Sequence, residues 1–63
     1  MQRFLFERHF TENGRESVSY QEKNFELSSK AMRYALEMLD EPCTLLVNVY
    51  RKYNLDWVHI CQY

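Results

Sequence analysis

The chain has 63 residues, of which 46% are hydrophobic and 16% aromatic, with a single Gly and a single Pro. A chain this short forms at most one domain with a small core, and its composition is too apolar for a disordered segment. Eight Lys and Arg residues nearly balance nine Asp and Glu residues. The charge therefore does not favour duplex nucleic acid or an anionic membrane as a partner, because both select basic surfaces.

No stretch has the length and apolar composition of a signal peptide or a membrane span. We therefore expect one cytoplasmic domain over residues 1–63 that does not enter a membrane. In a reducing compartment Cys43 and Cys61 are expected to behave as small hydrophobic residues, and a disulfide between them is not assumed.

Residues 2–11 predict the first strand, because their polarity alternates and places Phe4 and Phe6 on one face. The dipeptide Asn13-Gly14 predicts a hairpin turn, since both residues tolerate the positive φ that a tight turn requires. A second strand is then expected to run to about residue 23.

The length of this turn decides which face Val18 and Tyr20 occupy, because a slip of one residue moves every side chain to the other face. A two-residue turn would place them opposite the phenylalanines. A three-residue turn over residues 12–14 pairs Phe6 with Tyr20 and Arg8 with Val18 instead. We expect the three-residue turn, with Gly14 left-handed, because it gathers the large apolar groups on one face.

Residues 28–41 predict the helix, with Ser28 or Ser29 as its N-cap and Pro42 ending it. Its apolar stripe has helical spacing and consists of Leu27, Ala31, Met32, Ala35, Leu36 and Leu39. Tyr34 and Met38 form a second apolar pair at the edge of this stripe, which we expect to pack on the rim of the sheet.

Residues 43–52 and 55–63 predict a second hairpin, with Tyr53 and Asn54 as its two-residue turn. In this register Arg51 faces Asp56 and Tyr50 faces Trp57. The inward face expected for this hairpin consists of Leu45, Val47, Val49, Val58 and Ile60.

The elements in chain order predict an α+β fold of type ββαββ. We expect a four-stranded, mainly antiparallel sheet with the helix packed on one face, because a crossover of this kind lays the helix on the sheet. The strand order 2-1-3-4 keeps every neighbouring pair antiparallel.

One helix covers only one side of a sheet, and the other side of an antiparallel sheet is normally polar. Here the second hairpin is expected to place a mixed, aromatic set there: Leu46, Asn48, Tyr50, Lys52, Leu55, Trp57, His59, Cys61 and Tyr63. The first hairpin adds Arg3, Leu5, Glu7 and His9. Such a face either stabilises the sheet by cross-strand pairs or binds a partner.

We expect this face to bind a protein partner, because Trp and Tyr dominate interface hot spots. The predicted partner-binding residues are Leu46, Tyr50, Trp57, His59 and Tyr63. The predicted function is that of a small interaction module, such as an inhibitor of the phage or mobile-element type that docks on a host enzyme or regulator. The alternatives are a homodimer and a single-stranded nucleic-acid-binding module, in which Tyr50, Trp57 and Tyr63 would stack on bases.

Catalysis is not expected. His59 and Cys61 should share a face, but they lack the spacing and the further ligands of a zinc site, and no oxyanion motif accompanies them as a nucleophile pair. With one Gly the chain has no glycine-rich phosphate loop. We therefore predict no catalytic residue, no metal and no cofactor.

Overall fold

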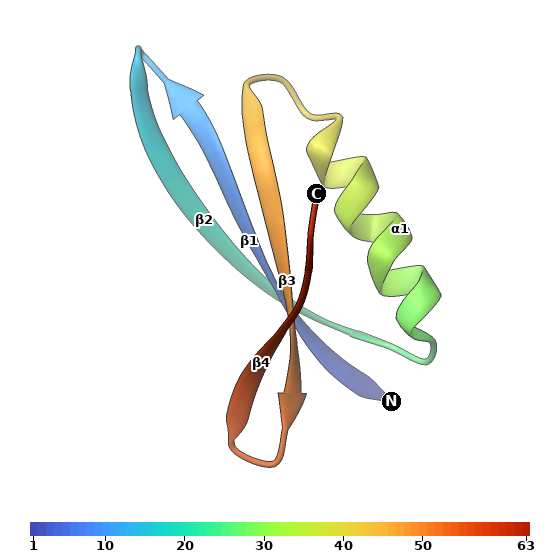
Figure 1. Cartoon of the computed structure of the whole chain (residues 1–63). Helices are drawn as coiled ribbons and strands as arrows, with labels where there is room; N and C mark the ends of the chain where they lie inside the picture. The colour runs from blue at the N-terminus through green and yellow to red at the C-terminus, as the bar shows by residue number, and fades with distance from the viewer.

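The computed structural model describes all 63 residues as four strands and one helix. The elements in chain order are β1 (Gln2–Glu12), β2 (Arg15–Phe25), α1 (Ser28–Leu39), β3 (Thr44–Tyr53) and β4 (Asp56–Gln62). Every neighbouring strand pair is antiparallel, and the order in the sheet is β2-β1-β3-β4. The predicted ββαββ fold and its strand order are confirmed, with α1 on one side of the sheet (Figure 1).

The core lies between α1 and the two central strands. Four side chains of β1 and β3 have no exposed area, and three residues of α1 pack on them; the seven are Phe4, Phe6, Val47, Val49, Ala31, Ala35 and Met38. Small alanines let the helix backbone approach the sheet, which places the larger Phe rings directly beneath it. Tyr34 and Phe25 extend this core toward β2, where the Tyr34 ring meets Phe6 edge-on at 5.0 Å.

The turn between β1 and β2 has two residues, because Glu12 pairs with Arg15. Asn13 and Gly14 adopt φ of 52° and 77°, as a type I′ turn requires at both positions. The expected three-residue turn is wrong. As a result Val18 lies opposite His9 and Tyr20 opposite Glu7, on the side of the sheet that faces away from α1.

The helix is rotated about its axis relative to the predicted stripe. Met38 is buried, whereas Leu27 and Leu36, which were expected to pack on the sheet, are exposed. The expectation that Tyr34 and Met38 pack on the sheet is confirmed. The Tyr34 hydroxyl donates a hydrogen bond of 2.9 Å to Gln21 Oε1, which ties this flank of the helix to β2.

The helix begins at Ser28, as predicted, but its N-cap residue and its C-terminal end differ from prediction. Leu27 occupies the N-cap position, and Ser28 Oγ donates to Gln2 Oε1 at 3.2 Å, so neither serine caps the helix. The helix ends at Leu39, two residues earlier than expected. Cys43 then adopts φ of 64°, and its carbonyl accepts a 2.9 Å hydrogen bond from the Thr11 N–H, which fixes the entry into β3.

The turn of the second hairpin is one residue later than predicted, at Asn54-Leu55, because Tyr53 pairs with Asp56. Asn54 adopts the expected positive φ, at 55°. The pairing is therefore displaced by two residues, so Arg51 lies opposite Val58 and not opposite Asp56.

A β-bulge then interrupts β4. Tyr50 pairs with His59 and Val49 with Cys61, which leaves Ile60 as the extra residue. Of the five residues predicted on the inward face of this hairpin, only Val47 and Val49 are buried. Leu45, Val58 and Ile60 are exposed. Leu45 is left unpaired at a second irregularity, between the pairs His9–Leu46 and Phe10–Thr44, whereas Ile60 is the bulge residue of β4. Val58 lies opposite Arg51 and not opposite Val49 as predicted.

Replacing valine by aspartate should destabilise the fold on the helix side of the sheet and be tolerated on the side that faces away from α1. Val47→Asp should unfold the chain, because an unpaired carboxylate in the core costs at least about 4 kcal/mol, comparable to the roughly 3–5 kcal/mol that so small a core supplies. Val18→Asp is the matched control and should stay folded, since Val18 is exposed on the face away from α1. Far-ultraviolet circular dichroism with urea unfolding measures both; a folded Val47→Asp would contradict the described core.

Candidate functional site

The face of the sheet that turns away from α1 is not covered by any element of the chain. Because side chains alternate along a strand, burial of Phe4 and Phe6 under α1 places their neighbours on this side, and the strand pairing extends it across the sheet. We call this surface the open face; it comprises Arg3, Leu5, Glu7, His9, Glu16, Val18, Tyr20, Glu22, Leu46, Asn48, Tyr50, Lys52, Trp57 and His59.

Four of the five predicted partner-binding residues lie together on the open face: Leu46, Tyr50, Trp57 and His59. The fifth, Tyr63, does not. It exchanges two 2.9 Å backbone hydrogen bonds with Val47, a core residue, so its side chain is on the helix side of the sheet. The bulge at Ile60 causes this change, because one extra residue reverses the alternation of everything that follows.

The aromatic pairing on the open face also differs from the expected one. Tyr50 lies opposite His59, and their rings meet edge-on at 5.2 Å. Trp57 lies opposite Lys52, whose Nζ is 5.4 Å from the centre of the indole ring. Aromatic and cation–aromatic contacts of this kind hold side chains in fixed positions on an exposed sheet.

A chain of hydrogen bonds crosses three strands at the centre of the open face. Glu7 Oε1 accepts from His9 Nε2 at 2.6 Å and from Asn48 Nδ2 at 3.0 Å. Because the Asn48 amide nitrogen donates to Glu7, its Oδ1 is the acceptor for His59 Nε2, at 3.0 Å. Both histidines therefore carry a proton on Nε2, and the four side chains orient one another.

These contacts change the ionisation of the central groups. The hydrogen bond from His9, and after it the one from Asn48, lower the pKa of Glu7 below 4.5, so the carboxylate is charged at neutral pH. Partial burial raises the pKa of Tyr50, and the nearby negative charge of Glu7 raises it further. The centre of the open face is thus a charged carboxylate that accepts hydrogen bonds from His9 and Asn48.

The first hairpin contributes more to this face than predicted. Val18 and Tyr20 are exposed on it, and Tyr20 is the more open of the two, at 63%. The signal that could have placed them there is Asn13-Gly14 itself, the strongest sequence signature of a two-residue turn.

The bulge also separates His59 from Cys61, which were expected to share a face. Cys61 Sγ lies 3.1 Å from Met32 Sδ on the helix side, and burial raises the pKa of its thiol. Both Cys61 and Cys43 are free. Because they lie on opposite sides of the sheet, His59 and Cys61 do not form a nucleophile pair. No group of three or more His, Cys, Asp or Glu residues comes together to hold a metal ion.

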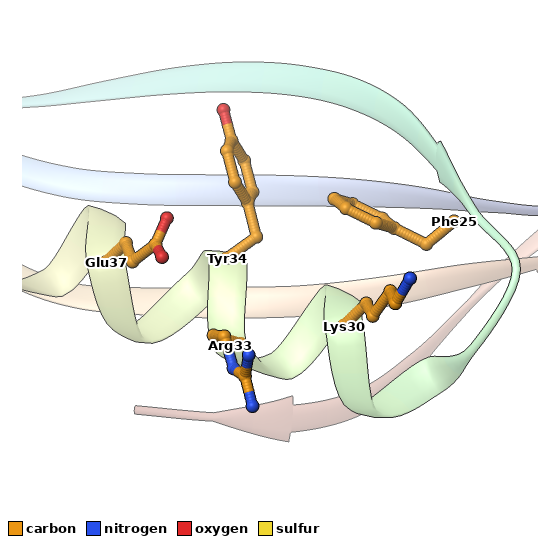
Figure 2. Close-up of a pocket in the computed structure, with 5 residues that line it drawn as sticks. All are labelled: Phe25, Lys30, Arg33, Tyr34 and Glu37. Atoms are coloured by element: carbon orange, nitrogen blue, oxygen red, sulfur yellow. The ribbon is translucent and has the colours of Figure 1, made fainter.

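A shallow pocket of about 240 Å³ lies elsewhere, between α1 and the end of β2. Figure 2 shows Tyr34 and Phe25 lining it, with Glu37 and Lys30 on the helix to either side of Tyr34 and Arg33 pointing away. Its volume is below the roughly 300–1,000 Å³ of ligand sites, and charges of both signs surround it. The open face, with its Tyr and Trp side chains, is therefore the candidate site.

Comparison with protein-family models, with curated proteins and with solved structures finds no match to this chain. The helix α1, with 12 residues, is not long and apolar enough to cross a membrane.

The role of Glu7 predicts a pH dependence. A carboxylate whose pKa is lower in the folded than in the unfolded chain stabilises the fold above its ordinary pKa of 4.5, and this stability is lost as the pH falls through the folded pKa. Glu7→Gln should lower the free energy of unfolding at pH 7 by about 1 kcal/mol and reduce its decline below pH 4.5.

Urea unfolding at a series of pH values measures this effect. Glu16→Gln is the control on the same face, and it should keep the pH dependence of the unmodified chain, because Glu16 is exposed and has no ion pair. Equal behaviour of the two variants would contradict the described network.

Proposed function

We propose that this chain is a small protein-binding module that docks on a partner protein through the open face. The observation that carries the proposal is that Leu46, Tyr50 and Trp57 stand on a sheet surface that no part of the chain covers. Tyr and Trp supply large contact areas at low entropic cost, which is why they anchor interfaces. A module of this kind inhibits or regulates its partner by covering part of the partner's surface.

The hydrogen-bonded centre supports docking by preorganisation. Hydrogen bonds link the side chains of Glu7, His9, Asn48 and His59, and the Tyr50 ring meets the His59 ring edge-on. Side chains that are already fixed lose little conformational freedom on binding, so more of the contact energy appears as affinity. An open face with fixed side chains fits a partner surface whose side chains are also fixed before binding.

The charged residues of the open face indicate which kind of partner surface it favours. The open face carries three carboxylates, Glu7, Glu16 and Glu22, against two cations, Arg3 and Lys52. This balance favours a partner surface that presents Lys or Arg side chains beside apolar ones. It disfavours single-stranded nucleic acid, whose phosphates need a basic groove.

Removing the indole of Trp57 should weaken partner binding by about 30-fold, the equivalent of about 2 kcal/mol at an interface hot spot. The measurement is a tagged pull-down from a lysate of cells that carry the protein, with and without nuclease, read by mass spectrometry. Tyr53→Ala is the matched control, because Tyr53 is an exposed aromatic residue of the same hairpin on the opposite side of the sheet.

One stoichiometric protein that survives nuclease, is retained by Tyr53→Ala and is lost with Trp57→Ala would support the proposal. Circular dichroism confirms that each variant is folded. Recovery that disappears on nuclease treatment would move the proposal to nucleic acid, and recovery unaffected by Trp57→Ala would exclude the open face as the docking surface.

A further inference from the structure

A second apolar surface lies on the other side of the sheet, along β4. The helix packs over β1 and β3 and contacts β4 at Cys61 through Met32, but it leaves other residues of β4 exposed. Val58 and Tyr63 are 44% and 36% exposed on this side, although residues of these types are usually buried. Ile60, the bulge residue between them along the strand, is 36% exposed. We call these three residues, together with Leu36 of α1, the β4 seam.

The flank of α1 and the end of β4 lie side by side at the seam. The contact between Cys61 and Met32 joins β4 to the helix, and α1 and β4 run in the same direction (Figure 1). Tyr63 lies two residues beyond Cys61 along the strand, and Leu36 lies one turn beyond Met32 along the helix. The distance along the strand from Cys61 to Tyr63 and the distance along the helix from Met32 to Leu36 are both about 6–7 Å. Leu36 and Tyr63 therefore lie at the same level of the seam.

The two edges of the sheet are protected differently. The outer strand β2 carries Arg15, Glu16, Glu22 and Lys23, charges of the kind that prevent an edge strand from pairing. The outer strand β4 has one charge, Asp56, at its first residue, and no Lys, Arg or Pro follows. The β4 seam therefore adjoins an edge that lacks this protection.

We propose that the β4 seam is covered by a second copy of this chain, in a two-fold dimer. A two-fold axis brings each surface against itself, which the four uncharged side chains of the seam tolerate and a surface with an excess of one charge does not. The open face, with its excess of carboxylates, is the poorer surface for self-association. A second copy is also the partner that a folded domain with only seven buried residues and two free cysteines needs for stability.

A stable interface buries at least about 600 Å² on each partner, which is about one-seventh of the 4462 Å² surface of this chain. A dimer through the seam must therefore cover that share of each copy.

The test is the oligomeric state in solution, measured by sedimentation equilibrium over a range of concentrations. We expect a dimer that Val58→Lys weakens roughly 100-fold or more, because an ammonium group would have to be buried at the seam. Val18→Lys is the matched control: it places the same change at a valine of nearly equal exposure, 43%, on the open face, and should leave the dimer intact. Leu36→Lys provides a second seam variant on the helix, which decides the outcome if Val58→Lys does not fold.

A folded, monomeric seam variant beside a dimeric Val18→Lys would support the proposal. A chain that is monomeric at every concentration would overturn it, as would a dimer that both seam variants leave intact. A dimer lost only in Val18→Lys would place self-association on the open face. These outcomes do not depend on the partner-binding test, because Trp57 lies on the opposite side of the sheet from the seam.

Discussion

The rest of the structure depends on one packing constraint: a single helix rests on a sheet that is wider than the helix. Ala31 and Ala35 have no exposed area, so the helix lies close to β1 and β3. An α-helix with its side chains is about 10 Å across, whereas the outer strands of a four-stranded sheet are about 14 Å apart. The helix therefore buries the two central strands well. Part of the helix side of β4 and the whole open face are left without cover, and both candidate surfaces follow from this mismatch.

The sequence predicts the features that depend on periodicity over many residues. Alternation in β1, the helical spacing of Ala31 and Ala35, and the turn residues Asn13-Gly14 and Asn54 are sufficient to identify five elements, their order and the antiparallel topology. The burial of Val47 and Val49 also follows, because they occupy the inward positions of the most strand-like segment. These features tolerate an error of one or two residues at an element's boundary, and so the fold class could be predicted.

The sequence does not predict features that depend on a single residue of register. The choice between a two- and a three-residue turn moves Val18 and Tyr20 across the sheet, and the apparent gain in core volume favoured the wrong choice. In the structure, the space beside Phe6 that Tyr20 was expected to occupy is filled by Tyr34 of the helix, which packs on Phe6. The bulge at Ile60 has no glycine or proline to indicate it, yet it moves Tyr63 and Cys61 to the helix side. Four of the five predicted binding residues keep their face because they precede the bulge.

The charges on the two uncovered surfaces argue for different partners. A carboxylate at Glu7 that is ionised at neutral pH and already accepts two hydrogen bonds would face its own copy in any two-fold contact through the centre of the open face, at a cost in like-charge repulsion. The β4 seam has no such group. If the seam joins two copies, each copy keeps its open face free, since the two surfaces are on opposite sides of the sheet. The dimer then presents two identical docking faces in a fixed relation. A partner that is itself two-fold symmetric would bind both faces, and the effective concentration of the second face would raise its affinity above that for one face alone.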